Sequence, residues 1–276
     1  TPNSGQSTGE VDEVILTIDI SGLSIGLHNC ELTVISDGTV NSPQRVSINL
    51  YIDDGNGKLD VPSEFGSIQE AIDFATNGDV IIVAEGIYTG DGNRDIHFKG
   101  KALTVRSQNG PENCVIDCNG RETEPHRGFN FSNNLNTNAI IDGFTIINGY
   151  SDEGSGINCR DNQGSSLTIS NCNIRNHTSL GDYGVGNGAI SVRDGIYLIH
   201  NCLISNNSAS GIYCGDTIST AITNCTITGN TIGGIFCRGD SNVEISNCTI
   251  TANTFRDGGG IYCNGIISMT ITNCTI

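Results

Sequence analysis

Five times in the second half of the chain, an Asn-Cys pair is followed by an isoleucine two residues after the cysteine. The cysteines of this row are Cys172, Cys202, Cys225, Cys248 and Cys274, at intervals of 30, 23, 23 and 26 residues. Self-similarity at a period of roughly 20 to 50 residues is typical of solenoids, in which each repeat forms one rung of a stack. The recurrence therefore predicts a repetitive, stacked fold.

A second row of segments, Gly-Ile-x-Cys, runs in step with the first. Its members end at Cys159, Cys214, Cys237 and Cys263, and a degenerate member, Gly-Ala-Ile-Ser, ends at Ser191. The last four members end 11 residues before the next Asn-Cys cysteine, and the first ends 13 residues before it. Insertions therefore fall between an Asn-Cys segment and the next Gly-Ile segment, so the two rows belong to one rung.

The copy from Gly211 to Asn230 divides into three short strands, at residues 212–214, 220–222 and 225–227. Period-two alternation places cysteine and isoleucine on one face, and Asn224 suits the second turn because asparagine tolerates a left-handed backbone. A rung of about 23 residues with three parallel strands predicts an all-β, right-handed, single-stranded parallel β-helix.

The register extends towards the N-terminus with other residues at the inward positions. Residues 144–146 correspond to 172–174, residues 129–131 correspond to 157–159, and an earlier rung uses 96–98, 103–105 and 114–116. First strands ending at Phe98, Phe131, Cys159, Ser191, Cys214, Cys237 and Cys263 predict seven rungs.

A short amphipathic helix is predicted before the stack. Apolar residues at 68, 71, 72 and 75 follow helical spacing, with Ser67 as the N-cap and Glu70 completing a capping box. A buried strand follows at residues 80–83. We expect this helix to cap the first rung, which would otherwise expose its core and strand edges.

Residues 1–52 follow a different pattern. Residues 14–20, 30–35 and 45–52 are predicted as three alternating strands without any relation to the repeat. Three strands are few for a domain, so the span is interpreted as the second half of an immunoglobulin-like β-sandwich. The predicted organisation is this partial module at 1–52, a linker at 53–61 and the β-helix at 62–276.

Composition narrows the classes of function. A formal net charge of −17 argues against binding to a phosphate backbone and suits calcium, neutral glycans or simple solubility. Twelve cysteines occur, but no Cys-x-x-Cys does, and the five histidines form no ligand pattern, so the cysteines are interpreted as small apolar residues that fill the core. No apolar stretch is long enough to span a membrane.

Residues from about 62 to 276 resemble the pectate-lyase-like superfamily of right-handed parallel β-helix proteins, in its secreted bacterial form. The motifs that carry the resemblance are Ile-Gln-Glu-Ala-Ile-Asp (68–73), Gly-Asp-Val-Ile-Ile-Val (78–83) and the Asn-Cys-Thr-Ile rungs. The Gly-Ile-Tyr-Cys rungs are also similar to those of polymorphic membrane-protein autotransporters. Residues 22–52 resemble the end of a BACON-type immunoglobulin-like module, which commonly accompanies glycan-active or cell-surface regions.

The resemblance implies that polysaccharides bind along the first-strand face. Alternation points Asn130, Asn158, Ile190, Tyr213, Phe236 and Tyr262 outward, with Asp161 in the turn beyond Asn158. The predicted glycan-binding residues are Tyr213, Phe236, Tyr262, Asn158 and Asp161. An aromatic row can offer flat apolar area to a sugar chain. The alternative is an aromatic ladder that only stabilises neighbouring strands.

An enzymatic alternative is a polysaccharide lyase or glycoside hydrolase acting on an acidic polysaccharide. A lyase of this superfamily needs acids that hold calcium against a uronate and an arginine that takes the proton. The candidate residues are Arg193, Arg238, Asp194, Asp216 and Asp240, with Arg160 and Asp161 beside them. Each Arg-Asp neighbour pair can instead neutralise itself at the surface. The aspartate signatures of hydrolases with this fold do not occur in the predicted helix.

A calcium loop is a further candidate, through Asp54, Asn56 and Asp60, although Lys58 occupies a ligand position and the glycine is misplaced for an EF-hand-like loop. The sequence thus predicts a secreted or cell-surface bacterial β-helix protein that is non-catalytic, with the enzyme as the alternative. Its expected partner is a polysaccharide or cell-surface glycan and not a nucleic acid, and no cofactor is expected apart from calcium as a candidate ligand. We expect a monomer within a larger multidomain protein of which this chain is a fragment.

Overall fold

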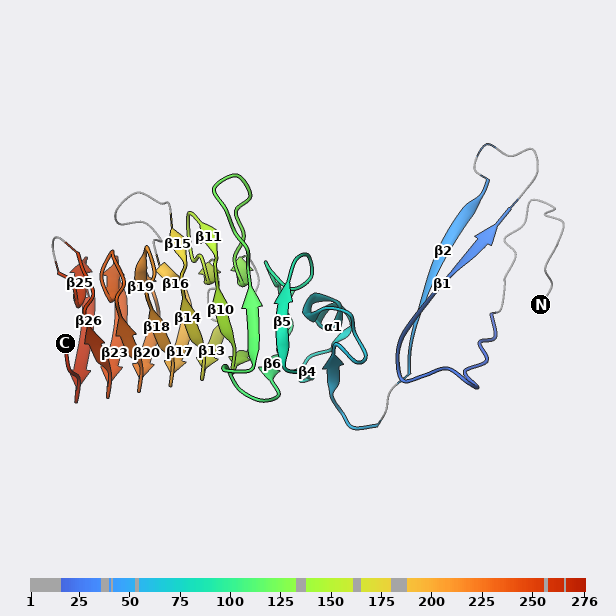
Figure 1. Ribbon diagram of the computed structural model, residues 1–276, viewed down its shortest axis with the longest axis horizontal. Helices are drawn as coiled ribbons and strands as arrows, with labels where there is room; N and C mark the ends of the chain where they lie inside the picture. The colour runs from blue at the N-terminus through green and yellow to red at the C-terminus, as the bar shows by residue number, and fades with distance from the viewer. Residues whose placement is uncertain are drawn as a thin grey trace. The chain divides into compact units, whose positions relative to one another are not determined.

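The structure is a computed structural model that describes residues 16–35, 40, 42–52, 55–132, 138–160, 165–179, 188–255, 258–265 and 267–276. The chain divides into two compact units, residues 1–54 and 55–276. Figure 1 shows the second unit as a stack of short strands that runs from the helix α1 to the C-terminus. This stack is an all-β parallel solenoid with a single short helix in its described part.

The first unit contains an antiparallel pair of strands, β1 (Gly26–Val34) and β2 (Gln44–Ile52). These correspond to the second and third strands that the sequence predicts. The first predicted strand, at residues 14–20, is wrong in its described part, because residues 16–20 have no regular secondary structure. Leu16, Ile18 and Ile20 are exposed there, without a neighbouring strand with which to pair among the described residues.

The second unit consists mainly of three parallel sheets. The nine-stranded sheet contains β3 (Leu59–Val61), β4 (Val80–Val83), β6 (Thr104–Ser107), β9 (Ala139–Asp142), β13 (Ser166–Ser170), β17 (Ile196–His200), β20 (Ser219–Thr223), β23 (Ser241–Ser246) and β26 (Ile267–Thr272). The seven-stranded sheet contains β5 (Gly86–Thr89), β7 (Cys114–Asp117), β10 (Thr145–Ile147), β14 (Asn173–Arg175), β18 (Leu203–Ser205), β21 (Thr226–Thr228) and β24 (Thr249–Thr251).

The six-stranded sheet carries the candidate functional face. It contains β8 (Phe129–Ser132), β12 (Ile157–Arg160), β16 (Gly188–Arg193), β19 (Ser210–Gly215), β22 (Ile235–Arg238) and β25 (Ile261–Asn264). A small pair, β11 (Tyr150–Ser151) and β15 (Thr178–Ser179), lies outside these sheets. The seven strands of the seven-stranded sheet confirm a solenoid of about seven turns.

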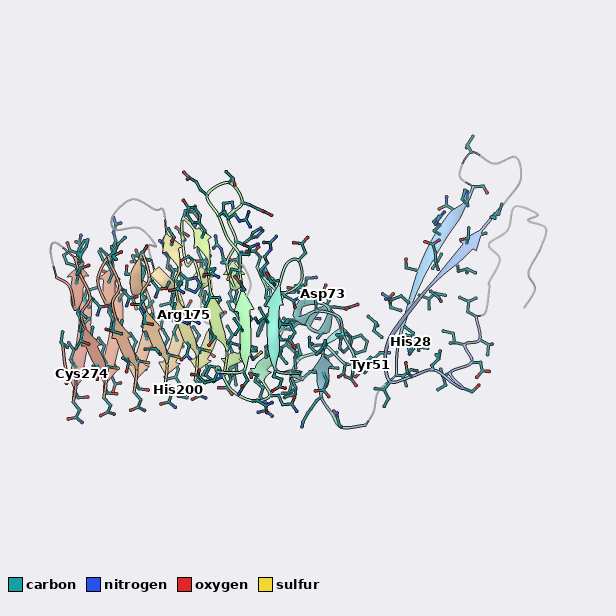
Figure 2. The ribbon with its side chains drawn as sticks, in the orientation of Figure 1. His28, Tyr51, Asp73, Arg175, His200 and Cys274 are labelled. Atoms are coloured by element: carbon teal, nitrogen blue, oxygen red, sulfur yellow. The ribbon has the colours of Figure 1, made fainter. Side chains whose placement is uncertain are left out.

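Residue pairing confirms most of the predicted register. Thr145 pairs with Asn173, and Cys214 pairs with Cys237, which in turn pairs with Cys263. Both cysteine rows lie in the core, where cysteine packs as a small apolar residue. The cysteines of these rows are buried except Cys263, which is exposed, and Cys274, which is half-buried in the last rung (Figure 2).

One rung departs from the predicted register by one residue. Ile190 pairs with Ile212 and Val192 pairs with Cys214, so Ile190 points inward and Ser191 points outward. The prediction placed Ile190 outward because it aligned Gly188 with Gly211. The strand instead puts Ala189 at the glycine position. Because side chains alternate between the two faces of a strand, this shift by one residue moves each side chain to the opposite face.

Two further boundaries differ from the sequence prediction. Residues 59–61, expected in the linker, form β3 and pair with β4. Residues 96–98, expected as a strand, make only an isolated bridge between Ile96 and Phe129. Both differences lie next to the helix and its following loop, where the repeat pattern is weakest.

The turn asparagines have the conformation that the sequence predicts. Asn171, Asn201, Asn224, Asn247 and Asn273 have φ values between +51° and +55°. Asparagine is one of the few residues that adopts this left-handed conformation routinely. The structure therefore confirms the reason for asparagine in the repeated Asn-Cys pair.

A second asparagine row, which the sequence analysis did not identify, lies inside the solenoid. The Oδ1 atom of Asn230 accepts the backbone N–H of Asn207 at 3.2 Å, and Asn253 Oδ1 accepts that of Asn230 at 3.0 Å. The amide groups also bond to one another, with 2.8 Å between Asn207 Nδ2 and Asn230 Oδ1. These bonds satisfy backbone and side-chain groups that would otherwise be buried without partners.

The helix α1 (Ile68–Phe74) begins as predicted, because Ser67 accepts the backbone N–H of Glu70 through its side chain at 3.2 Å. The Glu70 carboxylate returns to the backbone N–H of Gly66 at 2.9 Å, one residue before the cap. Ile68, Ala71 and Ile72 are fully buried. The amphipathic pattern thus attaches one face of the helix to the core.

Candidate functional site

The outward face of the six-stranded sheet contains one side chain per rung at each of two neighbouring positions. The pairing of β8, β12, β16, β19, β22 and β25 aligns these strands without an offset. The first outward row is Asn130, Asn158, Ser191, Tyr213, Phe236 and Tyr262. It divides into a polar half and an aromatic half.

The predicted aromatic residues lie on successive rungs and pack on one another. The rings of Tyr213 and Phe236 are stacked with centroids 5.7 Å apart and planes 18° apart. Phe236 and Tyr262 have centroids 4.8 Å apart. Tyr213 is 3% exposed and Phe236 is 5% exposed, whereas Tyr262 is half-buried. The ring faces of Tyr213 and Phe236 therefore contribute mainly to packing within the row.

Phe255 completes this aromatic cluster and was missed by the sequence analysis. Its ring packs edge-on against Phe236, with centroids 6.1 Å apart, and against Tyr262 at 5.5 Å. It comes from the turn after β24 and lies over the outward row. The one sequence feature that could have indicated its role is that it is the single aromatic residue in the turn Ala252-Asn253-Thr254-Phe255.

The second outward row contains the candidate arginines. Arg193 pairs with Gly215, and Gly215 pairs with Arg238. The Tyr213 ring leans over Gly215, since a Cβ there would lie 2.8 Å from a ring carbon. The guanidinium carbon of Arg193 lies 5.1 Å from the centroid of this ring, which is a cation–π distance. Arg193 is also 3.3 Å from Glu153 Oε1, measured from Nη2.

The candidate aspartates occupy separate turns of this edge. Asp194 and Asp216 follow the paired residues Arg193 and Gly215 and have φ values of +57° and +49°. The Asp216 carboxylate accepts the backbone N–H of Asp240 at 3.0 Å. Asp161 lies outside the described residues. The structure thus places Asp194 and Asp216 at equivalent turn positions, with Asp216 bonded to the backbone of the next rung.

The loop proposed for calcium uses its side chains within itself. Asn56 Oδ1 accepts the backbone N–H of Lys58 at 2.7 Å, and Asn56 Nδ2 donates to Asp60 Oδ2 at 3.3 Å. Asp54 lies outside the described residues. No group of three or more His, Cys, Asp or Glu side chains that could hold a metal ion occurs within the described ranges.

Comparison with known proteins agrees with the geometry of the second unit. Residues 155–276 match a family model described as a right handed beta helix region. The stacked parallel sheets and this match together support a right-handed β-helix. No curated protein and no solved structure shows significant similarity to the chain. In the described part of the chain, no helix has the length and apolar character needed to cross a membrane.

Proposed function

We propose that the protein is a secreted or cell-surface β-helix repeat protein that does not catalyse a reaction and that binds glycans or serves as an adhesive or structural stalk. The observation that carries the proposal is the use of the candidate catalytic groups in structural contacts. The Asp216 carboxylate bonds to the backbone of Asp240, and Arg193 faces Glu153. Acid and base groups held in this way support a scaffold more than a reaction centre.

Glycan binding would use the outward face of the six-stranded sheet. The half-buried rings of Tyr262 and Phe255 offer apolar area at one end of this face, and the row continues with the polar residues Asn158 and Ser191, which are 4% and 1% exposed. Arg160 and Arg238 border the row at the ends of β12 and β22. This combination of flat apolar area and oriented polar groups is what sugar recognition requires.

The number of strands per rung and the capping role of α1 are part of the same proposal. Each rung would contain three strands, one in each large sheet, and α1 would cap the N-terminal end of the stack. The segment that leads into α1 covers the outer edge of β3, because Glu64 Oε2 accepts the N–H of Asp60, and the backbone N–H groups of Glu64 and Phe65 bond to the Asp60 carbonyl. An edge occupied in this way does not pair with another chain.

The assignment to the pectate-lyase-like superfamily and the BACON-type module are also proposals. β1 and β2 form an amphipathic pair whose apolar face includes Leu32, Val34 and Val46, and Val34 and Val46 are exposed. Two strands alone are marginally stable in water, so further strands of an immunoglobulin-like sandwich would cover this face. We expect a monomer within a larger multidomain protein, with calcium as an optional ligand.

A panel of immobilised neutral and acidic polysaccharides tests the proposal. We expect binding without formation of products, and weaker binding by Tyr262→Ala and Phe255→Ala. Phe74→Ala is a matched control, because Phe74 is an exposed aromatic on α1. Unsaturated uronate products, detected by ultraviolet absorbance with and without calcium, would overturn the proposal in favour of a lyase. A folded protein that binds no glycan would leave the structural stalk.

A further inference from the structure

A short loop folds back over the polar half of the outward row. Residues 152–155, called the strap, connect β11 to β12. Gly154 has a φ of +51°, and a Cβ at this position would lie 2.6 Å from the Asn158 Cα and 2.6 Å from the Ile157 carbonyl oxygen. Only glycine brings the backbone this close. Asn158, at 4% exposure, is therefore buried against the strap.

Arginines from three successive rungs contact the two acidic side chains of the strap. Arg127 Nη2 lies 3.6 Å from Asp152 Oδ1. Arg160 Nη1 donates to Glu153 Oε2 at 3.0 Å, and Arg193 Nη2 lies 3.3 Å from Glu153 Oε1. Because Cys159 pairs with Val192, the arginines that follow them are neighbours on adjacent rungs. The Glu153 carboxylate thus contacts the guanidinium groups of two neighbouring rungs, one with each oxygen.

Several polar atoms of Arg193 and of the neighbouring outward row have no hydrogen-bond partner among the described residues. They are Arg193 Nε and Nη2, Ser191 Oγ and Asn158 Oδ1, all buried. A buried polar atom without a partner costs about 1–3 kcal/mol, and more when it is charged. The contact between Arg193 and Glu153 is therefore an ion pair without hydrogen-bond alignment. Glu153 therefore binds the Arg193 guanidinium less well than would a carboxylate that can approach its Nε–Nη2 edge.

The polar atoms without a partner indicate which chemical groups of a ligand could bind here. The Nε and Nη2 atoms of a guanidinium present two parallel N–H groups, which match the two oxygens of a carboxylate. Ser191 Oγ and Asn158 Oδ1 offer a donor and acceptors for hydroxyl groups. Arg127, Arg160 and Arg193 thus gather around the two carboxylates of the strap, in a chain whose net charge is −17. Among glycans, an acidic sugar is the class that carries both carboxylate and hydroxyl groups.

We propose that Arg160 and Arg193 form a carboxylate-binding site that Glu153 occupies from within the chain, and that displacement of the strap opens the site to an acidic glycan. This inference rests on the proposed glycan-binding function and adds the ligand class and the residue that competes with it. Glu153 acts as an internal competitor. Its removal increases affinity for an acidic ligand and leaves affinity for a neutral one unchanged.

Calorimetric titration with an oligogalacturonate and with its neutral methyl ester tests the inference. We expect Glu153→Gln to bind the acidic oligomer about tenfold more tightly than the original protein, a coupling of the size found between competing sites. Adding Arg193→Gln to this variant should abolish the gain. Glu124→Gln is the matched control, since Glu124 pairs with Arg94 outside the strap and should change nothing.

The outcomes separate the inference from the proposed function. Circular dichroism melting first establishes that each variant is folded. If the original protein binds neutral glycans and Glu153→Gln gains nothing for the acidic oligomer, the internal competition is wrong and glycan binding stands. If no variant binds any glycan, the internal competition and glycan binding are both wrong, and only the structural stalk stands. An equal gain for the acid and its methyl ester would also overturn the inference, because it would show loss of packing and not release of a carboxylate site.

Discussion

The imidazole of His177 makes, one rung earlier, the same pair of hydrogen bonds as the amide of Asn207. His177 Nδ1 accepts the N–H of Gly149 at 2.9 Å, and Asn207 Oδ1 accepts the N–H of His177 at 2.9 Å. His177 Nε2 donates to the Ile146 carbonyl at 3.0 Å, as Asn207 Nδ2 donates to the Ile174 carbonyl at 3.3 Å. The histidine is therefore a neutral member of the interior asparagine row.

This geometry makes the first rungs sensitive to acid. Burial, with a smaller contribution from nearby Arg175, lowers the pKa of His177 from 6.5 to about 4, although the hydrogen bonds to Ile146 and Ser155 act in the opposite direction. Protonation would also place a second N–H against that of Gly149. Because the unfolded chain binds the proton first, stability is complete above pH 6.5 and falls as the pH drops towards 4. The expected loss is on the order of 3 kcal/mol.

His177→Asn should remove this contribution, since asparagine supplies the same acceptor and donor. Urea unfolding at a series of pH values between 4 and 7 measures it as the difference in slope between the two proteins. His200→Asn, which changes a histidine at the end of β17 (Figure 2), is the control and should keep the original slope. Identical slopes for His177→Asn and the original protein would contradict the neutral histidine.

A row of left-handed turn residues follows the seven-stranded sheet, and Ala252 is its one member among the described residues that is neither glycine nor asparagine. Its φ is +54°, and Gly229, one rung earlier, has a φ of +69°. A left-handed conformation costs alanine about 1–2 kcal/mol. Ala252→Gly should therefore raise the free energy of unfolding by about 1 kcal/mol, as measured by urea denaturation.

The reverse change provides the matched test. Asn224→Ala places alanine at a φ of +54° in the other asparagine turn and should lower stability by about 1 kcal/mol. Asn224→Gly should cost less than that. If Ala252→Gly destabilises the protein, the alanine methyl group makes a packing contact that outweighs the backbone strain.

The repeat made the fold predictable, because each rung has the same alternation of inward and outward residues. A strand that is uncertain in one rung can therefore be assigned from the neighbouring rungs. The inward cysteines, the left-handed Asn224 and the helix start at Ser67 all follow from residue chemistry that acts within a few positions. The register of residues 188–193 was not predictable, because Gly188-Ala189 offers two positions for the small residue of the row. A shift by one residue then inverts the strand.

The candidate site was only partly predictable for a different reason. Alternation identified Tyr213, Phe236 and Asn158 as outward-facing, but facing outward is not the same as being exposed. Phe255 and the strap cover these residues from turns whose paths do not follow the repeat. The contacts of the Glu153 carboxylate with Arg160 and Arg193 depend on the path of the strap, which the positions of these residues in the sequence do not reveal.

The two cysteine rows should tolerate apolar residues and resist polar ones. Val192 stands where Cys214 stands one rung later, and both are fully buried. Cys214→Val should therefore change stability by less than about 1.5 kcal/mol. Cys214→Ser buries a hydroxyl group in an apolar position and should cost about 1–3 kcal/mol. Urea unfolding under reducing conditions measures both, and an equal loss in the two variants would indicate a role for the thiol itself.

Thiol reactivity offers a second measurement on the same rows. Burial raises the pKa of Cys159 and Cys118 well above the ordinary value, so the nucleophilic thiolate is scarce in the native protein. Cys30 is exposed. A thiol reagent at neutral pH should modify Cys30 quickly and the buried cysteines only on unfolding, as peptide mass mapping would show. Rapid modification of Cys159 in the folded protein would contradict its place in the core.

Gly149 lies where the interior row meets the strap, and it should not accept a side chain. A Cβ at this position would lie 1.7 Å from the Ser155 carbonyl oxygen and 2.6 Å from His177 Nδ1. Gly149→Ala must therefore displace both the end of the strap and the imidazole, at an expected cost of about 1–3 kcal/mol or more.

Gly66→Ala is the control for this change, because its added Cβ would meet only Glu70 Oε2 at 3.4 Å. Its stability should stay within about 0.5 kcal/mol of the original value. Thermal unfolding compares the two variants. Because Gly149→Ala also disturbs the bond to His177 Nδ1, it should weaken the dependence of stability on pH between 4 and 6.5. An unchanged melting temperature for Gly149→Ala would mean that the strap can move aside without cost.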